Sequence, residues 1–197
     1  MKKESGLSLI EASIVLVIAA SVSAGVLAYY NYAKETNNIN ESVKQIQVIA
    51  SGVSQLSRNA LTPIPSKDEA GGQEALNNYV RAVAELKGLD IDVSGEKVFF
   101  KLHNGYGVSI WRRTSVGANK YQLEVFTKNA SDCTKFATLN LGSIQWAPTT
   151  VADYTAPDDG ASVTDVSSAS RACKNAEKKL GNSGKTHSIN VRYSLQF

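Results

Sequence analysis

The first third of the chain carries two hydrophobic patterns, one directly after the other. Between Ala12 and Ala33, 22 consecutive residues have no charged side chain, and the apolar stretch from Leu7 to Tyr30 is long enough to cross a bilayer as a helix. Farther along, apolar residues recur at three- and four-residue steps, which is typical of one buried stripe on a polar helix. The members of this stripe are Ile39, Val43, Ile46, Ile49, Ala50, Val53 and Leu56.

Both patterns fit a single helix that ends before two prolines. Pro63 and Pro65 cannot continue a helix, so we expect it to cover residues 7–59. At about 1.5 Å per residue it is roughly 80 Å long, which exceeds the thickness of any bilayer. Residues 7–30 form the transmembrane or filament-core part, and residues 31–59 form the amphipathic part.

The remaining residues, 60–197, show the patterns of a globular head. A loop at Thr62–Gly72, with Ser66 and Glu69 at capping-box spacing, leads into a second helix that Gly88 ends. The predicted apolar face of this helix consists of Leu76, Tyr79, Val80, Val83 and Leu86.

Four strands are predicted in the head. The Asn-Gly pair at 104–105 joins apolar runs at Lys97–His103 and Tyr106–Arg113, which indicates a hairpin. Apolar and polar residues alternate around Leu123 and from Ile189 to Phe197, which indicates two more strands. We therefore expect an α+β fold in which a long N-terminal α-helical spine packs on an antiparallel β-sheet head.

The two cysteines enclose residues 133–173, which we treat as a separate region of the head. Cys133 is expected on a short helix opened by Ser131 and closed by Gly142, and Cys173 on a helix over Val166–Leu180. Residues 145–165, rich in Thr, Ala and Asp, are expected to form a surface loop. Two cysteines allow one bridge, and an export-type N-terminal segment favours it; the alternative is two unrelated buried thiols.

Composition excludes several classes of function. The net charge is +3 and no run of Lys and Arg exceeds two residues, so we expect no nucleic-acid partner. His103 and His187 have no cysteine or acid at ligand spacing, so we expect no metal site and no cofactor. No catalytic constellation is present, and we expect a protein that is not an enzyme.

The N-terminal segment allows three interpretations, and the acid Glu11 distinguishes between them. A secretory signal peptide and a plain membrane anchor both explain the apolar run. Neither explains Glu11, because a carboxylate in a membrane is costly and by default implies a function and a partner. Cleavage after Gly6 would leave a free amine on Leu7, and the Glu11 of one subunit could then neutralise the amine of a neighbour.

The stretch from Gly6 to Glu11, followed by an unbroken apolar helix, resembles the class III signal of type IV prepilins. The resemblance implies cleavage between Gly6 and Leu7, N-methylation of Leu7 and an assembly role for Glu11. The string from Gly6 to Glu11 together with Ser23–Val26, and the segments around both cysteines, Ala137–Gly142 and Ala172–Asn175, resemble the type IVb group.

The family implies a leader at residues 1–6 and a set of partners. These are the prepilin peptidase, the pilus assembly machinery and further copies of the chain in a helical filament. The subunit would sit in the inner membrane with its head in the periplasm, and then in an extracellular pilus that serves adhesion, bundling or aggregation. The region bounded by Cys133 and Cys173 would supply subunit contacts and exposed filament surface.

Two alternatives remain open. The first is a minor pilin or a type II secretion pseudopilin, which shares the processing but is present at low abundance. The second is a secreted binding domain behind an ordinary signal peptide, which would be cleaved near Ala24 rather than after Gly6.

Overall fold

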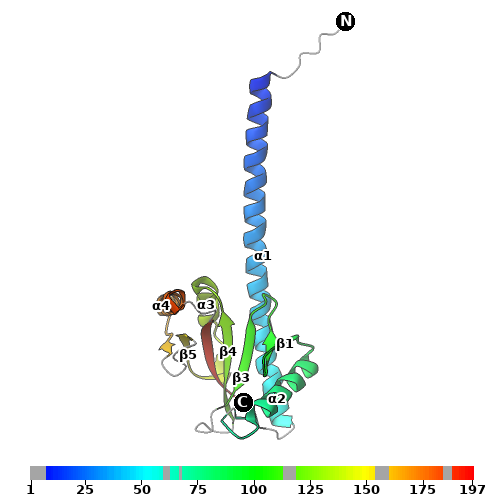
Figure 1. Cartoon of the computed structure of the whole chain (residues 1–197), viewed down its shortest axis with the longest axis vertical. Helices are drawn as coiled ribbons and strands as arrows, with labels where there is room; N and C mark the ends of the chain where they lie inside the picture. The colour runs from blue at the N-terminus through cyan, green and yellow to red at the C-terminus, as the bar shows by residue number, and fades with distance from the viewer. Residues whose placement is uncertain (1–7, 60–62, 67, 113–118, 154–159, 184–187) are drawn as a thin grey trace. The chain divides into compact units, whose positions relative to one another are not determined.

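The computed structural model describes residues 8–59, 63–66, 68–112, 119–153, 160–183 and 188–197 (Figure 1). The chain forms two compact units, one up to Asn40 and one from Glu41 to Phe197, which we describe separately. The helices are α1 (Leu9–Asn59), α2 (Gly72–Lys87), α3 (Ala130–Ala137), the 3₁₀ helix η1 (Gly142–Ile144) and α4 (Val166–Ser183). The strands are β1 (Ile91–Ser94), β2 (Lys97–Lys101), β3 (Gly107–Trp111), β4 (Lys120–Thr127), β5 (Gln145–Asp153), β6 (Ala161–Ser162) and β7 (Ile189–Gln196).

The first unit consists of the N-terminal part of α1. Its side chains from Leu9 to Asn37 are exposed, and the apolar residues give an 18-residue window with a mean hydropathy of 2.2, none of it buried. This helix is therefore long and apolar enough to cross a membrane, as the sequence predicted.

The second unit begins with the C-terminal part of α1, which lies against α2. The predicted stripe is buried at Ile46, Ile49 and Val53, whereas Val43 is only half-buried. A Cβ on Gly52 would lie 2.9 Å from a methyl carbon of Val83, so the close approach of α1 and α2 requires glycine there.

Helix α2 ends where the sequence predicted, at Gly88. This residue has a φ of 63°, and the next amide, Leu89, donates to the Ala84 carbonyl at 2.9 Å. One member of the predicted face is wrong, because Leu86 is exposed and Ala84 takes a buried position. The predicted capping box is also wrong, since the helix starts at Gly72 and Ser66 instead bridges to Arg112.

The strands form one antiparallel sheet in the order β1-β2-β3-β4-β7-β5-β6. The predicted hairpin is present with shorter strands: Phe100 pairs with Val108, and Gly105 takes a φ of 82° in the turn. The expectation of four strands is corrected to seven in the described part of the chain, because β1, β5 and β6 lack the sequence patterns used to predict strands.

Strand β5 lies inside residues 145–165, which the sequence predicted to be a loop. Its register against β7 shifts between Ala147 and Thr150, on either side of Pro148. Proline cannot donate to a strand ladder, and a bulge accommodates it. Nonlocal pairing with β7 thus overrides a local composition typical of loops.

Strand β7 lies between β4 and β5 and is buried along its length up to Leu195. Its apolar side includes Tyr193, whose hydroxyl donates to the Phe136 carbonyl at 2.6 Å, and burial raises the pKa of this phenol well above its usual range. On the polar side, Arg192 Nε lies 2.6 Å from Glu124 Oε1 in a buried ion pair. A central position explains why even the polar residues of this strand are buried.

Candidate assembly site

The first turn of α1 carries the acid that the sequence singled out. The backbone N–H of Ser8 donates to Glu11 Oε2 at 2.8 Å, and the N–H of Glu11 donates to Ser8 Oγ at 3.3 Å. These reciprocal bonds are a capping box, which satisfies two amides that the start of a helix leaves without partners. Gly6 and Leu7, the predicted cleavage and methylation site, lie outside the described residues.

The capping box leaves half of the Glu11 carboxylate available. Oε2 accepts from Ser8, whereas Oε1 has no hydrogen-bond partner among the described residues. The positive end of the helix dipole favours a negative charge at this place. Glu11 is also the one charged side chain between Ser8 and Ala33. The structure therefore holds a single oriented carboxylate at the start of an apolar helix, with one oxygen open to a further donor.

Ser8 was not among the predicted site residues, although its signal is visible in the sequence. A Ser three residues before a Glu, directly ahead of an apolar run, is the pattern of a capping box. The capping box predicted at Ser66 lies where no helix begins.

The surface around this acid offers hydrocarbon and few polar groups. Leu9, Leu16 and Tyr29 are at least 70% exposed. The hydroxyls of Ser13 and Ser21 donate to the carbonyls of Ile10 and Val17, each at 2.8 Å, so they are satisfied within the helix. A helix that is apolar on all sides needs lipid or other apolar helices around it.

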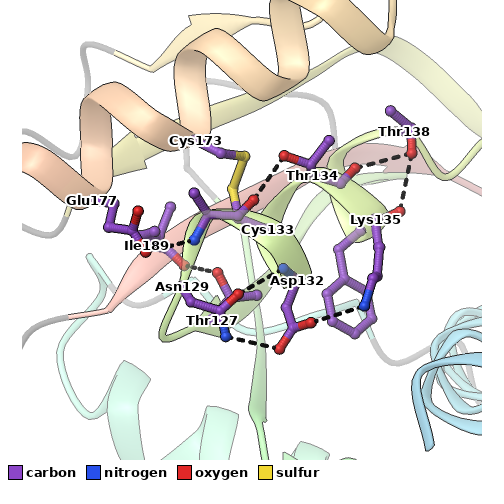
Figure 2. Close-up of a disulfide and its surroundings, with 12 residues drawn as sticks. Thr127, Asn129, Asp132, Cys133, Thr134, Lys135, Thr138, Cys173, Glu177 and Ile189 are labelled. Atoms are coloured by element: carbon purple, nitrogen blue, oxygen red, sulfur yellow. Dashed lines mark hydrogen bonds and ion pairs between the residues drawn. A yellow bond between two sulfur atoms is a disulfide. The ribbon is translucent and has the colours of Figure 1, made fainter. Parts of the chain in front are cut away.

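In the second unit, a disulfide joins Cys133 of α3 to Cys173 of α4 (Figure 2). The Cα atoms lie 5.8 Å apart, and both cysteines are fully buried. This is the bridge that the two cysteines allowed, so the alternative of two unrelated thiols is excluded. The bridge spans a sequence separation of 40 residues and holds α4 against the sheet side that carries α3.

A second link between α3 and α4 lies beside the disulfide (Figure 2). Glu177 of α4 accepts a hydrogen bond from the backbone N–H of Ala130 at 2.9 Å, which satisfies an amide at the start of α3. Asn129 caps the same helix by accepting from the N–H of Asp132 at 2.8 Å. The prediction that Ser131 opens this helix is therefore wrong by two residues, and Gly142 begins η1 rather than closing α3.

The start of α4 is also capped by a side chain. The backbone N–H of Ser168 donates to Asp165 Oδ1 at 2.7 Å, and the N–H of Asp165 donates to Ser168 Oγ at 3.0 Å. The bond from the Ser168 amide, followed by those from the Ser167 side chain and Thr164, lowers the pKa of Asp165 to about 2. The ionised carboxylate is therefore the form that stabilises α4.

This shift predicts how the stability of the head depends on pH. The pKa of Asp165 in the folded chain lies below its unfolded value of about 3.9, so its contribution is complete above about pH 5 and is lost as pH falls toward 2. We expect Asp165→Ala to lower the free energy of unfolding at pH 6 and to have a much smaller effect at pH 2, where about half of the carboxyl groups are protonated in the folded chain. Chemical denaturation of the detergent-solubilised chain at several pH values measures this, and a pH-independent difference would contradict it. Asp165→Asn, which caps without titrating, is the control.

Among the described residues, no group of three or more His, Cys, Asp or Glu is placed to hold a metal ion. His187 lies outside the described residues, and the backbone N–H of His103 donates to Gln45 Oε1 at 2.6 Å. The positions of interest in the described structure are thus Glu11 with Ser8 in the first unit, and Cys133 with Cys173 in the second.

An apolar helix with one oriented acid in its first turn, an antiparallel head and a disulfide are together the features expected of a pilin-like protein. No protein-family model matches the chain. Its sequence is 27% identical over 146 residues to the major structural subunit of the bundle-forming pilus of Escherichia coli O127:H6 (strain E2348/69 / EPEC), covering 72% of this chain and 68% of that protein. The same protein of Escherichia coli O111:H- matches equally well.

These matches show that the chain is homologous to a known subunit of a type IV pilus, the protein called bundlin. Among solved structures, the crystal structure of a type IVb pilin from Salmonella typhi aligns with a TM-score of 0.49 and 14% sequence identity. That alignment covers 79% of this chain and 98% of the Salmonella chain. The resemblance that the sequence indicated is confirmed by this sequence match over 146 residues.

Proposed function

We propose that the chain is the major structural subunit of a type IVb pilus. In this proposal a prepilin peptidase cuts between Gly6 and Leu7, the new N-terminus of Leu7 is methylated, and the assembly machinery draws the apolar helix out of the inner membrane into a filament. The extracellular filament then serves adhesion, bundling or aggregation. The observation that supports it most is Glu11, held by Ser8 with one oxygen still open.

The chemistry of Glu11 explains both attraction and register. A buried carboxylate and a buried amine each cost several kcal/mol alone, and pairing offsets much of that cost. In a stack of identical helices the amine on Leu7 of one subunit would meet Glu11 Oε1 of its neighbour. Any other register would leave both charges without partners among apolar side chains, so the pair would select one register.

Processing is tested by changing the residue before the proposed cut. We expect Gly6→Ala to leave most of the chain as the longer precursor in the inner membrane, because the peptidase would have to accept a side chain beside the scissile bond. Immunoblots of membrane and sheared fractions measure this. Gly25→Ala is the matched control, since a Cβ there would meet nothing within 4 Å. Normal processing of Gly6→Ala would contradict the proposed cleavage site.

The role of Ser8 is tested separately. We expect Ser8→Ala to reduce filament yield several-fold without abolishing it, because the variant loses the cap on the Glu11 amide, worth about 1 kcal/mol, but keeps the bond from its own backbone to Glu11. Ser8→Thr, which retains the hydroxyl, should assemble normally. Ser13→Ala is the control, because that hydroxyl bonds only to the Ile10 carbonyl. A yield from Ser8→Ala equal to that of the control would contradict this role.

Abundance separates a major subunit from a minor pilin or a pseudopilin. A major subunit makes up most of the protein in purified filaments, whereas an initiating subunit is present in traces. Quantitative mass spectrometry of purified filaments should therefore find this chain as the most abundant protein, and its presence in traces beside a dominant second pilin would assign it a minor role.

A further inference from the structure

We propose that the head carries two complementary charged surfaces through which successive copies of this chain contact each other in the filament. One is a basic face on α4, and the other is an acidic edge formed by α2, β1 and the turns beside them. The inference rests on the proposed function, because it requires a filament of identical subunits.

The basic face consists of Arg171, Lys174 and Lys178. These residues are three and four positions apart, so they lie on one side of α4, and all three are exposed. The opposite side of the helix is buried through Ala169, Cys173 and Ala176. None of the three bases forms an ion pair with a described residue. Helix α4 has four basic residues and one acid, a net charge of +3.

The acid of α4 does little to compensate this charge at the surface. Glu177 is exposed, and its Oε1 accepts from the Ala130 amide at the start of α3 at 2.9 Å. It forms no ion pair with a described residue, so no base of the basic face is paired within α4.

The acidic edge consists of Glu85, Asp90, Asp92 and Glu96, all of them exposed. Residues 74–96 contain five acids and two bases, a net charge of −3. One of those bases, Lys87, donates to Gln55 at 2.7 Å rather than to an acid. The four carboxylates form no ion pair with a described residue.

The fold places these two surfaces on opposite sides of the head. Strand β1 is one edge of the sheet and β6 is the other, while α2 packs on β2 and α4 packs on β5 (Figure 1). The net charge of +3 on α4 and the net charge of −3 on residues 74–96 are equal in size and opposite in sign. Such a pair of surfaces suits a second copy of the same chain.

The arrangement favours a chain of subunits over a closed dimer. In a two-fold dimer each surface meets itself, so Lys174 would face Lys174 and Asp92 would face Asp92. In a head-to-tail contact the basic face of one copy meets the acidic edge of the next, and the contact repeats without closing. Exposed charges mainly steer and orient partners, so the apolar helices would supply most of the affinity and these surfaces the relative orientation of the heads.

Charge reversal tests this contact in cells that carry the complete assembly machinery. The first variant reverses the basic face (Arg171→Glu, Lys174→Glu, Lys178→Glu), and the second reverses the acidic edge (Glu85→Lys, Asp90→Lys, Asp92→Lys). Each variant alone opposes like charges, and we expect the yield of sheared filaments to fall about tenfold or more. A third variant with both reversals restores opposite charges and should return to within about twofold of wild type.

Two further arms make the outcome specific. Co-expression of the two single-reversal variants in one cell should also restore filaments, and these should contain both variants. The acidic surfaces of one variant can then pair with the basic surfaces of the other. Reversal of three exposed bases elsewhere in the head (Lys44→Glu, Arg58→Glu, Lys128→Glu) is the matched control and should leave the yield within about twofold of wild type.

The inference is overturned if either single reversal assembles like wild type, or if the combined reversal is no better than the single ones. Both results would leave the proposed function intact, because wild-type filaments would still form. Absence of wild-type filaments in the same cells would instead overturn the proposed function. Rescue by the combined variant also shows that the single reversals do not act by unfolding the head.

Discussion

The variant Glu11→Ala is expected to form no surface filaments while its head stays folded. In the assembled state the amine on Leu7 would be left without a counter-charge among apolar helices, a situation that costs about 3–5 kcal/mol when one partner of a buried pair is removed. At about 1.4 kcal/mol per factor of ten, this lowers the equilibrium constant for each added subunit at least a hundredfold. Electron microscopy and the amount of subunit in the sheared fraction measure the loss.

A more conservative change separates the charge of Glu11 from its capping bond. Glu11→Gln keeps an oxygen that can accept from the Ser8 amide but loses the negative charge, so we expect it to fail in assembly nearly as completely as Glu11→Ala. Glu41→Ala is the matched control, because Glu41 is an exposed acid on the same helix whose ion pair with Lys44 is worth little. Filaments from Glu11→Gln at wild-type yield would show that the charge is not what assembly requires.

Removing the disulfide is expected to have the largest effect on the stability of the head. The bridge closes a loop over a sequence separation of 40, and loop-closure entropy assigns it about 4 kcal/mol, a substantial part of the 5–15 kcal/mol that stabilises a typical domain. We expect the double variant Cys133→Ala, Cys173→Ala to lose an amount of this order in urea unfolding of the detergent-solubilised chain. Alanine is preferred to serine because both sites are fully buried and a hydroxyl would lack a partner.

A reductant provides the control for this prediction. Full reduction of the wild-type chain in denaturant, followed by refolding under reducing conditions, should produce the same loss of stability, and the double variant should not respond to the reductant. A loss below about 1 kcal/mol would mean that the link from Glu177 to Ala130 and the packing of α4 hold the region without the bridge.

The elements that the sequence predicted well are those with strong local signals. The apolar run before Lys34, the stripe through Ile46 and Val53, and the Asn-Gly turn at Gly105 each act over a few residues. Glu11 is equally visible as a single acid in an apolar run, and its role in assembly stays a prediction.

The elements that the sequence missed depend on distant contacts. Strand β5 looks like a loop, since Pro148 interrupts it, and it becomes a strand only because β7 lies beside it. Strand β7 was predicted as a strand, but its alternating pattern gave no sign that Arg192 is buried, which depends on Glu124 of the neighbouring strand. The bond from Ala130 to Glu177 joins residues 47 positions apart, a separation at which no local pattern operates.

Helix capping shows a second source of error, in which two local signals compete. Asn129 and Ser131 both lie near the start of α3, and only the structure shows that Asn129 has the extended backbone of a cap. The same Ser-x-x-Glu spacing occurs at Ser8 and at Ser66, and it forms a capping box only at Ser8, where an apolar helix follows directly.

The most direct test of the central claim is the intact mass of the protein in sheared surface filaments. We predict a dominant species that consists of residues 7–197, carries one additional methyl group on Leu7, and lacks two hydrogens because of the disulfide between Cys133 and Cys173. A dominant species that begins near Gly25, as cleavage by an ordinary signal peptidase near Ala24 would leave it, would contradict the claim that α1, with Glu11 in its first turn, builds the filament.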